Sequence, residues 1–303
     1  MQRPQQRRRR RLSRSLIALS QSSQVVGVRI RCKDDPMKRT VAALLDIEID
    51  EATNLEFKIA VTRAPGVELL ETMSFVHDGN PIEPREVIAE HGTRIHLLDC
   101  APGKLIVSYD ATVIGRAEPA SVGDYDVSKY LRPSRYAEAD KFFGFVAGQF
   151  DLATPPAELL LEVTRWVSTH LSYVPGTSRG TDSAVDTLLA GAGVCRDYSH
   201  LTISLLRAVG IPARLVAVYA PGCDPMDFHA VVEASIDNVW RVVDATQLAP
   251  RSNLVRISTG RDAADTAFLD NHGGSITLHA SEVRAVVEGV LDNDDYATLT
   301  SIG

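Results

Sequence analysis

The chain has 303 residues, of which 45% are hydrophobic and 23% are charged, and its formal net charge at pH 7 is −7. About 300 residues exceed the size at which one hydrophobic core usually keeps growing, so we expect two folded domains. The apolar content is ordinary for a soluble protein, and no apolar run approaches the ~20 residues that a membrane span needs. The four cysteines, at positions 32, 100, 195 and 223, show no C-x-x-C spacing, and no segment is a convincing signal peptide. We therefore expect free thiols and a cytoplasmic location.

The first 36 residues are strongly basic. They contain an unbroken run from Arg7 to Arg11 and ten Lys or Arg against two Asp, a local charge of +8 that leaves about −15 for residues 37–303. Such a segment has little to bury, so we predict a disordered tail, or an extension upstream of a true start at Met37. Contact of Arg7 to Arg11 with nucleic acid or an anionic membrane is the alternative. We expect no nucleic-acid binding by the rest of the chain.

Alternating polar and apolar residues then predict a β-rich unit over residues 37–118. Turn signals such as Pro65-Gly66, Asp78-Gly79-Asn80 and Pro102-Gly103 separate its strands. The expected strands are Val41–Ile49, Leu55–Val61, Leu69–Val76, Thr93–Leu98 and Gly103–Thr112. Their number and spacing are typical of an antiparallel β-sandwich. We expect a linker over residues 119–135 and a second unit over 136–303.

Helices dominate the first part of this second unit. Apolar spacing and turn signals predict helices over 137–150, from Thr154 to Leu171, over 182–189 and from Tyr198 to Gly210. An apolar strand is expected over 213–219. Helices followed by strands in this order predict an α+β core in which a helix packs against an antiparallel sheet.

Cys195 is the most informative residue of the chain. It follows the Gly191-Ala-Gly193 turn and directly precedes the Tyr198 to Gly210 helix. The positive end of the helix dipole and the free backbone N–H groups of a first turn favour a thiolate over a thiol. A cysteine before an apolar helix can also be a small core residue, so its interpretation depends on residues further along the chain.

His229 and Asp244 are those residues. Two strand-like segments, 227–236 and 239–246, flank the polar pair Asp237-Asn238, which predicts a tight hairpin. If Ile236 pairs with Val239, Asp244 lies opposite Val231 and shares a face with His229. The spacing therefore suits an imidazole held by a carboxylate, as in a triad of nucleophile, base and orienting acid.

Several sequence blocks around these residues resemble the transglutaminase-like superfamily. The candidate residues lie in the blocks Gly191–Leu201, Asp227–Glu233 and Val239–Thr246, and Leu206–Arg214 is a further block of the same core. Tyr130–Tyr136 and Arg256–Asp265 are further similar to its bacterial branch of cysteine proteases, in which a β-sandwich precedes the core. The resemblance spans about residues 37–285. The chain departs from the family pattern at Val231, where an aromatic residue is usual, and at Ala245, where proline is common.

This resemblance implies a papain-like fold and a Cys195, His229 and Asp244 catalytic triad. The sequence contains no phosphate-binding glycine loop, dinucleotide fingerprint or metal-spaced cluster, so we expect no cofactor or metal. It implies attack on an amide carbonyl and a thioester intermediate. If water accepts the acyl group, the enzyme is a peptidase or amidase, which is the interpretation we favour. If a lysine-type amine accepts it, the enzyme is a protein-glutamine transglutaminase. A binding scaffold without turnover is a third possibility, against which the complete triad argues. The expected partner is a protein or peptide substrate, and nothing in the sequence indicates an oligomeric state.

Two other features have structural interpretations. Arg261 and Asp262 suggest an internal ion pair within a turn, and Glu233 lies on the predicted hairpin face of His229 as a buried partner or supporting contact.

Overall fold

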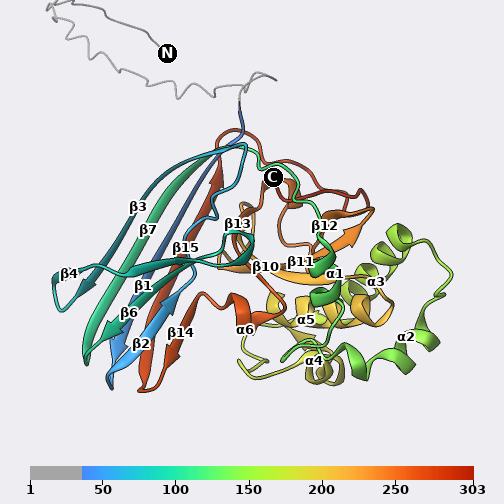
Figure 1. Cartoon of the computed structure of the whole chain (residues 1–303), viewed down its shortest axis with the longest axis horizontal. Coiled ribbons are helices and arrows are strands. Elements are labelled where there is room, and N and C mark those ends of the chain that lie inside the picture. Colours follow the sequence, from blue (N-terminus) through green and yellow to red (C-terminus); the bar gives the residue numbers. More distant parts are fainter. Residues whose placement is uncertain (1–35) are drawn as a thin grey trace, which may run out of the picture.

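The computed structural model describes residues 36–303, so the predictions for the basic segment concern residues outside the described range. Helices and antiparallel sheets form the α+β architecture that the sequence predicts (Figure 1). A large β-sandwich occupies one side of the molecule, and most of the helices occupy the other. A third sheet, β10 to β13, lies between them. Within residues 36–303, none of the helices is both long and apolar enough to cross a membrane.

The sandwich is built from two antiparallel sheets, with strand orders β15-β1-β7-β3-β4 and β14-β2-β6-β5. Alternate residues of β1 are buried, as the sequence pattern predicts for a strand with one face on a core. Residues from both sheets contribute to one hydrophobic core. The strands are β1 (Lys38–Ile49), β2 (Thr53–Phe57), β3 (Val67–His77), β4 (Asn80–Ile82), β5 (Arg85–Ile88), β6 (Arg94–Cys100), β7 (Gly103–Gly115), β14 (Leu269–His272) and β15 (Ile276–Val287).

The last two of these strands come from the far end of the chain. β15 pairs with β1 along its length, and β14 pairs with β2. The proposed division at residues 118 and 136 stays a prediction, but 269–287 lie in the sheets of the N-terminal unit rather than in the second unit. The predicted linker, 119–135, contains a helix of its own, α1 (Asp124–Tyr130).

The helical layer surrounds one central helix, α5 (Cys195–Ala208). Its apolar side packs against a core shared with the third sheet and the other helices. It is followed by Gly210, whose positive φ of 86° suits a chain reversal that glycine makes without strain. The predicted helix over 137–150 is broken into a short 3₁₀ turn, Ala139–Lys141, and α2. The other helices of this layer are α2 (Phe143–Gln149), α3 (Pro156–His170) and α4 (Ala184–Ala190).

The third sheet has the antiparallel order β12-β11-β10-β13. Its hairpin has the predicted register, because Ile236 pairs with Val239. Asp237 and Asn238 both have positive φ, 52° and 60°, which is typical of a two-residue type I′ turn. The remaining elements are β8 (Ser172–Tyr173), β9 (Ala192–Gly193), β10 (Ala213–Tyr219), β11 (His229–Ile236), β12 (Val239–Val243), β13 (Val255–Gly260) and α6 (Ala263–Thr266).

Hydrogen bonds join the third sheet to the sandwich. The buried Tyr219 hydroxyl donates to the carbonyl of Ile59 at 2.8 Å. Thr62 bonds to β13 twice, through its hydroxyl to Ile257 O at 2.9 Å and through its amide to Arg256 O at 3.0 Å. The sandwich therefore packs directly against the sheet that carries β10 and β11, next to the candidate site.

Candidate active site

Cys195 is the first residue of α5 and is half-buried. The two-residue strand β9 precedes it and pairs in parallel with β8, so that Tyr173 lies opposite Gly193. Asp197 N and Tyr198 N both donate to the carbonyl of Val194, which closes the first turn behind the thiol. The sulfur is thus held at the N-terminal end of a 14-residue helix, as the sequence predicts.

Asp197 shapes this turn. Its carboxylate accepts from Val194 N at 2.8 Å and from the Arg196 guanidinium at 2.8 and 3.2 Å. A Cβ at position 193 would lie only 2.6 Å from the Cβ of Asp197, so glycine is required there. Because the Arg196 guanidinium offsets the buried Asp197 charge, this carboxylate serves the helix terminus without leaving an unpaired anion beside the thiol.

His229 and Asp244 meet as the hairpin register predicts. His229 begins β11, Asp244 directly follows β12, and their side chains are 2.8 Å apart from Nε2 to Oδ2. Both residues are buried, with exposed fractions of 2% and 3%. The other carboxylate oxygen, Oδ1, accepts from the Thr246 amide at 2.9 Å and the Thr246 hydroxyl at 2.7 Å. Asp244 is therefore fixed from two sides.

The same contacts shift the pKa values of the pair. Burial alone lowers the pKa of His229, but the Asp244 charge and hydrogen bond, together with the neighbouring Cys195, raise it well above its usual range. Burial raises the pKa of Asp244, and the His229 charge and the Thr246 hydrogen bonds outweigh that effect and lower it. Since Nε2 is engaged by Asp244, Nδ1 is the ring nitrogen left for Cys195. The structure thus brings all three predicted site residues together.

Tyr173 is a fourth residue at this point, which the sequence analysis missed. Its hydroxyl lies close to the backbone N–H of Cys195, and burial, followed by the nearby Cys195 charge, raises the pKa of the phenol. The β8–β9 pairing brings it there. A two-residue parallel bridge leaves no periodic pattern in a sequence, so no signal could have found it.

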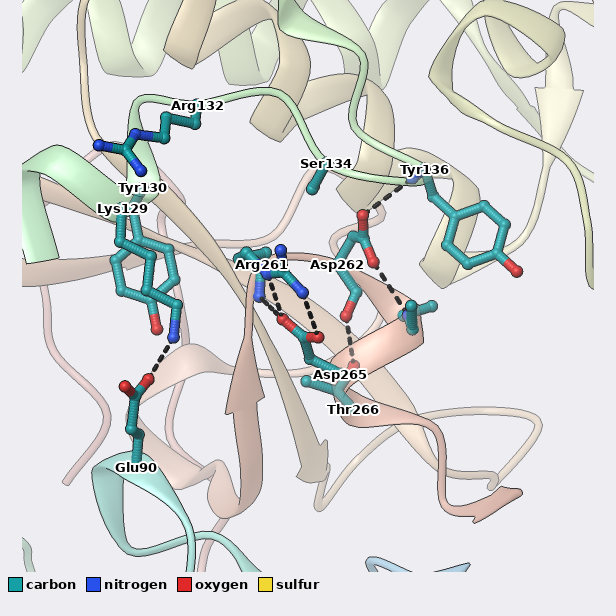
Figure 2. A network of polar contacts seen from close by, with 12 residues as sticks. Glu90, Lys129, Tyr130, Arg132, Ser134, Tyr136, Arg261, Asp262, Asp265 and Thr266 are labelled. Atoms are coloured by element: carbon teal, nitrogen blue, oxygen red, sulfur yellow. Dashed lines mark hydrogen bonds and ion pairs between the residues drawn. The ribbon is translucent and has the colours of Figure 1, made fainter. Parts of the chain in front are cut away.

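A cavity of about 350 Å³ adjoins Cys195 and His229. One wall is α6, which is held by the contacts in Figure 2. Asp262 accepts from Tyr136 N at 2.8 Å and from Ala264 N at 2.9 Å. Arg261 pairs with Asp265 at 2.8 Å, whereas the sequence analysis expected it to pair with Asp262; the helical turn places residue 265 within reach.

The cavity wall also includes Lys58, which directly follows strand β2 of the sandwich. Its side chain is buried, and its ammonium lies 3.2 Å from both Glu56 and Asp270. Lys58 N donates to the carbonyl of Phe268, which fixes the segment that enters β14. Sequence reasoning could not connect Lys58 with Cys195, because only the packing of the two units brings them to one cavity.

Glu233, four residues after His229, is the centre of a buried ion network. Arg214 lies 2.8 Å and Arg256 2.5 Å from its carboxylate. Burial opposes ionisation, but the Arg256 and Arg214 charges lower the pKa of Glu233 to about 2. Glu233 is thus a buried partner, one of the roles expected from its place in the hairpin. Among residues 36–303, no group of three His, Cys, Asp or Glu side chains is arranged to hold a metal ion.

Comparison with known proteins agrees with this architecture. Residues 145–245 match the family model of the transglutaminase-like superfamily, a range that includes Cys195, His229 and Asp244. The chain is similar to the crystal structure of a candidate cysteine protease from Cytophaga hutchinsonii, with 31% identity and a TM-score of 0.76. The similarity covers 89% of this chain and 94% of that protein. An uncharacterised protein of Mycobacterium leprae is 26% identical over 215 residues, 68% of each chain. One from Mycobacterium tuberculosis is 27% identical over 99 residues, 33% of this chain and 32% of that protein.

Proposed function

Since the chain belongs to the transglutaminase-like superfamily, we propose that it is a thiol enzyme that hydrolyses amide or peptide bonds. Cys195 is the nucleophile, His229 the base and acid, and Asp244 the residue that orients the imidazole. The observation that carries the proposal is the contact of 2.8 Å between buried His229 and Asp244, with Cys195 close enough to the same imidazole to raise its pKa. A nucleophile, a base and an orienting acid in this arrangement suit acyl transfer.

The reaction begins with transfer of the thiol proton to Nδ1 of His229. The thiolate attacks the amide carbonyl carbon, and the carbonyl π electrons move to oxygen. The tetrahedral intermediate collapses as Nδ1 returns the proton to the leaving nitrogen, so that an amine departs and a thioester remains on Cys195. Water then attacks the thioester with His229 as base, the thiol is restored, and a carboxylic acid is released.

Two donors beside Cys195 suit the stabilisation of a negative oxygen. The backbone N–H of Cys195 is at the N-terminus of α5, and the Tyr173 hydroxyl lies close to that N–H. Donors aimed at a developing oxyanion contribute strongly to catalysis of acyl transfer. We assign the oxyanion site to this N–H together with the phenol O–H of Tyr173.

The molecule that accepts the acyl group from the thioester distinguishes hydrolysis from cross-linking. Peptides containing internal glutamine and varied backbone bonds are incubated with the protein, with and without a primary amine, and followed by mass spectrometry and ammonia release. We expect new carboxyl termini or free glutamate, with Cys195→Ala inactive. Incorporation of the amine in preference to water would assign a transglutaminase instead. Equal turnover by Cys195→Ala would refute the thiol mechanism.

We place this activity in the cytoplasm. Cys100, Cys195 and Cys223 are all free thiols in the structure, and Cys100 and Cys223 are buried. Burial raises the pKa of Cys100 to about 11, with the Asp99 charge adding to the effect, which keeps that thiol protonated and unreactive. A reducing compartment suits a thiol nucleophile without disulfides. The proposed partner is a protein or peptide substrate.

A further inference from the structure

The cavity beside Cys195 owes its volume to small side chains. Five alanines line it, and they are contributed by β10, β11, α6 and the residue that follows α6. Ala217 and Ala230 face each other in the β10–β11 ladder, so two methyl groups stand where larger strand residues would close the space. The cavity of about 350 Å³ is within the range of roughly 300–1,000 Å³ that is usual for ligand sites.

Apolar groups complete the lining of this cavity. Phe228 and Phe268 are stacked, with their ring centroids 4.7 Å apart, and both contribute to the wall. Leu215 and Ile257 add aliphatic surface from β10 and β13. Burial of apolar surface is favourable, so such a wall favours an apolar ligand group.

Charges around the cavity are balanced. Two cationic and two anionic side chains line it. The Lys58 ammonium is 3.2 Å from Asp270, and the Arg196 guanidinium is 2.8 Å from Asp197. Asp227 accepts from the amide of Phe228 at 2.7 Å. An anionic ligand group would find Lys58 and Arg196 already paired, and a cationic one would find only Asp227 without an ion pair. Either group would lose its water on entry, so the electrostatics favour an uncharged ligand group.

A second hollow adjoins the cavity. Lys58 and Ala264 line both the cavity and a groove of about 600 Å³, which continues past Lys129, Arg132 and Arg261. Figure 2 shows these three side chains, of which Lys129 pairs with Glu90 and Arg261 pairs with Asp265. The groove is polar where the cavity is apolar, so it suits the main chain of an extended peptide whose one side chain enters the cavity.

We propose that the cavity is a specificity subsite that takes one bulky, uncharged apolar side chain of a peptide, next to the carbonyl that Cys195 attacks. This inference rests on the proposed thiol chemistry and extends it to a substrate class. The sandwich takes part in substrate selection, because Lys58 forms part of the cavity wall and fixes Phe268 through its backbone N–H.

The first experiment measures alkylation of Cys195 by N-acetyl amino-acid chloromethyl ketones that carry glycine, leucine, phenylalanine, aspartate or lysine side chains. Iodoacetamide, which has no side chain, reports the thiol itself. We expect the leucine and phenylalanine reagents to react at least about tenfold faster than the glycine, aspartate or lysine reagents. One methylene more or less in an apolar pocket changes the specificity for a substrate by about 10- to 200-fold. Equal second-order rate constants for all side chains would overturn the subsite.

A pair of variants locates the effect. Ala264 is exposed on α6, so Ala264→Phe fills the cavity mouth without disturbing a core, and we expect the leucine-to-glycine ratio to fall to about one. Ala147 is an exposed alanine of α2 outside the cavity lining, and Ala147→Phe is expected to keep the ratio of the parent protein. A leucine preference that survives in Ala264→Phe, with an unchanged melting temperature, would contradict this location.

Binding without chemistry separates the two proposals. In Cys195→Ala, N-acetyl-leucinamide is expected to raise the melting temperature, and N-acetyl-aspartic acid amide is not. This result would support the subsite even if iodoacetamide showed the thiol to be unreactive, an outcome that would refute only the proposed function. No shift with either amide would overturn the subsite even if Cys195 proved to be the nucleophile.

Discussion

The contact between Asp244 and Thr246 makes Asp244→Asn an informative substitution. Thr246 donates to Oδ1 of Asp244 through both its amide and its hydroxyl. In the variant, the amide oxygen keeps these two donors, so the NH₂ group is turned toward Nε2 of His229. Nε2 must then accept, which places the ring proton on Nδ1 and leaves that nitrogen unable to take the thiol proton.

The expected loss follows from the roles of base and orienting acid. General base catalysis contributes about 10²- to 10⁴-fold, and the same Asp to Asn change in a Ser-His-Asp triad costs about 10⁴-fold. At about 1.36 kcal/mol per tenfold, this is a barrier increase of about 2.7–5.4 kcal/mol. The assay is the stopped-flow burst of p-nitrophenol as p-nitrophenyl acetate acylates the protein. The measured quantity is the rate constant of the burst.

Asp186→Asn is a matched control. Asp186 accepts from both the amide and the hydroxyl of Ser183 at 2.9 Å, as Asp244 does from Thr246, but it caps α4 and has no histidine partner. We expect its burst rate to stay within about threefold of the parent. A similar rate in Asp244→Asn would refute the reasoning, because the tautomer would then not matter.

The same variant changes the dependence of stability on pH. The pKa of His229 is raised on folding, so its stabilising effect is fully present below about pH 6.5 and is lost as pH rises through the folded value. The pKa of Asp244 is lowered, so its effect is lost as pH falls through a folded value below 3.8. The urea midpoint of the parent should therefore fall as pH rises above 6.5, more steeply than that of Asp244→Asn. Parallel curves would contradict the ion pair.

Two further predictions concern the oxyanion site and the buried ion network. Tyr173→Phe should slow acylation by p-nitrophenyl acetate by about 10²- to 10³-fold. Alkylation by iodoacetamide should keep its rate, because that displacement forms no oxyanion. Equal losses in both reactions would assign Tyr173 to positioning the thiol. Glu233→Gln leaves Arg214 and Arg256 without their buried counter-ion and should cost about 3–5 kcal/mol in urea unfolding. Glu288→Gln, in the exposed ion pair with Lys38, should cost under about 1 kcal/mol. Because the pKa of Glu233 is lowered to about 2, with burial opposed by the Arg256 and Arg214 charges, its contribution should be present above about pH 4.5 and be lost on acidification toward pH 2. Similar costs for the two Gln variants would contradict the role of burial.

The sequence predicted the parts of the site that depend on local geometry. The two-residue turn at Asp237-Asn238 fixed the hairpin register, and the register set the faces of His229 and Asp244. The sequence also predicted that Cys195 lies at the start of a helix, because a glycine turn precedes an apolar helical pattern there. The α+β class was confirmed for the same reason, since each element carried its own periodicity.

Long-range packing was beyond the sequence. β15 completes a sheet with β1, which lies more than 200 residues earlier, and no pattern in residues 276–287 names that partner. Lys58 reaches the cavity only because the sandwich docks on the third sheet. Helix α1 was missed because Gly, Pro and Ser flank it and few of its residues are apolar. Arg261 pairs with Asp265 rather than Asp262, a choice made by the one-turn helix α6.

The central claim is that Cys195 forms an acyl-enzyme with the help of His229. The most direct measurement is mass spectrometry of the protein quenched in acid within the burst with p-nitrophenyl acetate, followed by peptide mapping. The account predicts one acetyl group, located on Cys195, and a burst rate reduced at least about 10²-fold in His229→Ala. Acetylation of Cys100 or Cys223 instead, or an equal rate in His229→Ala, would contradict it.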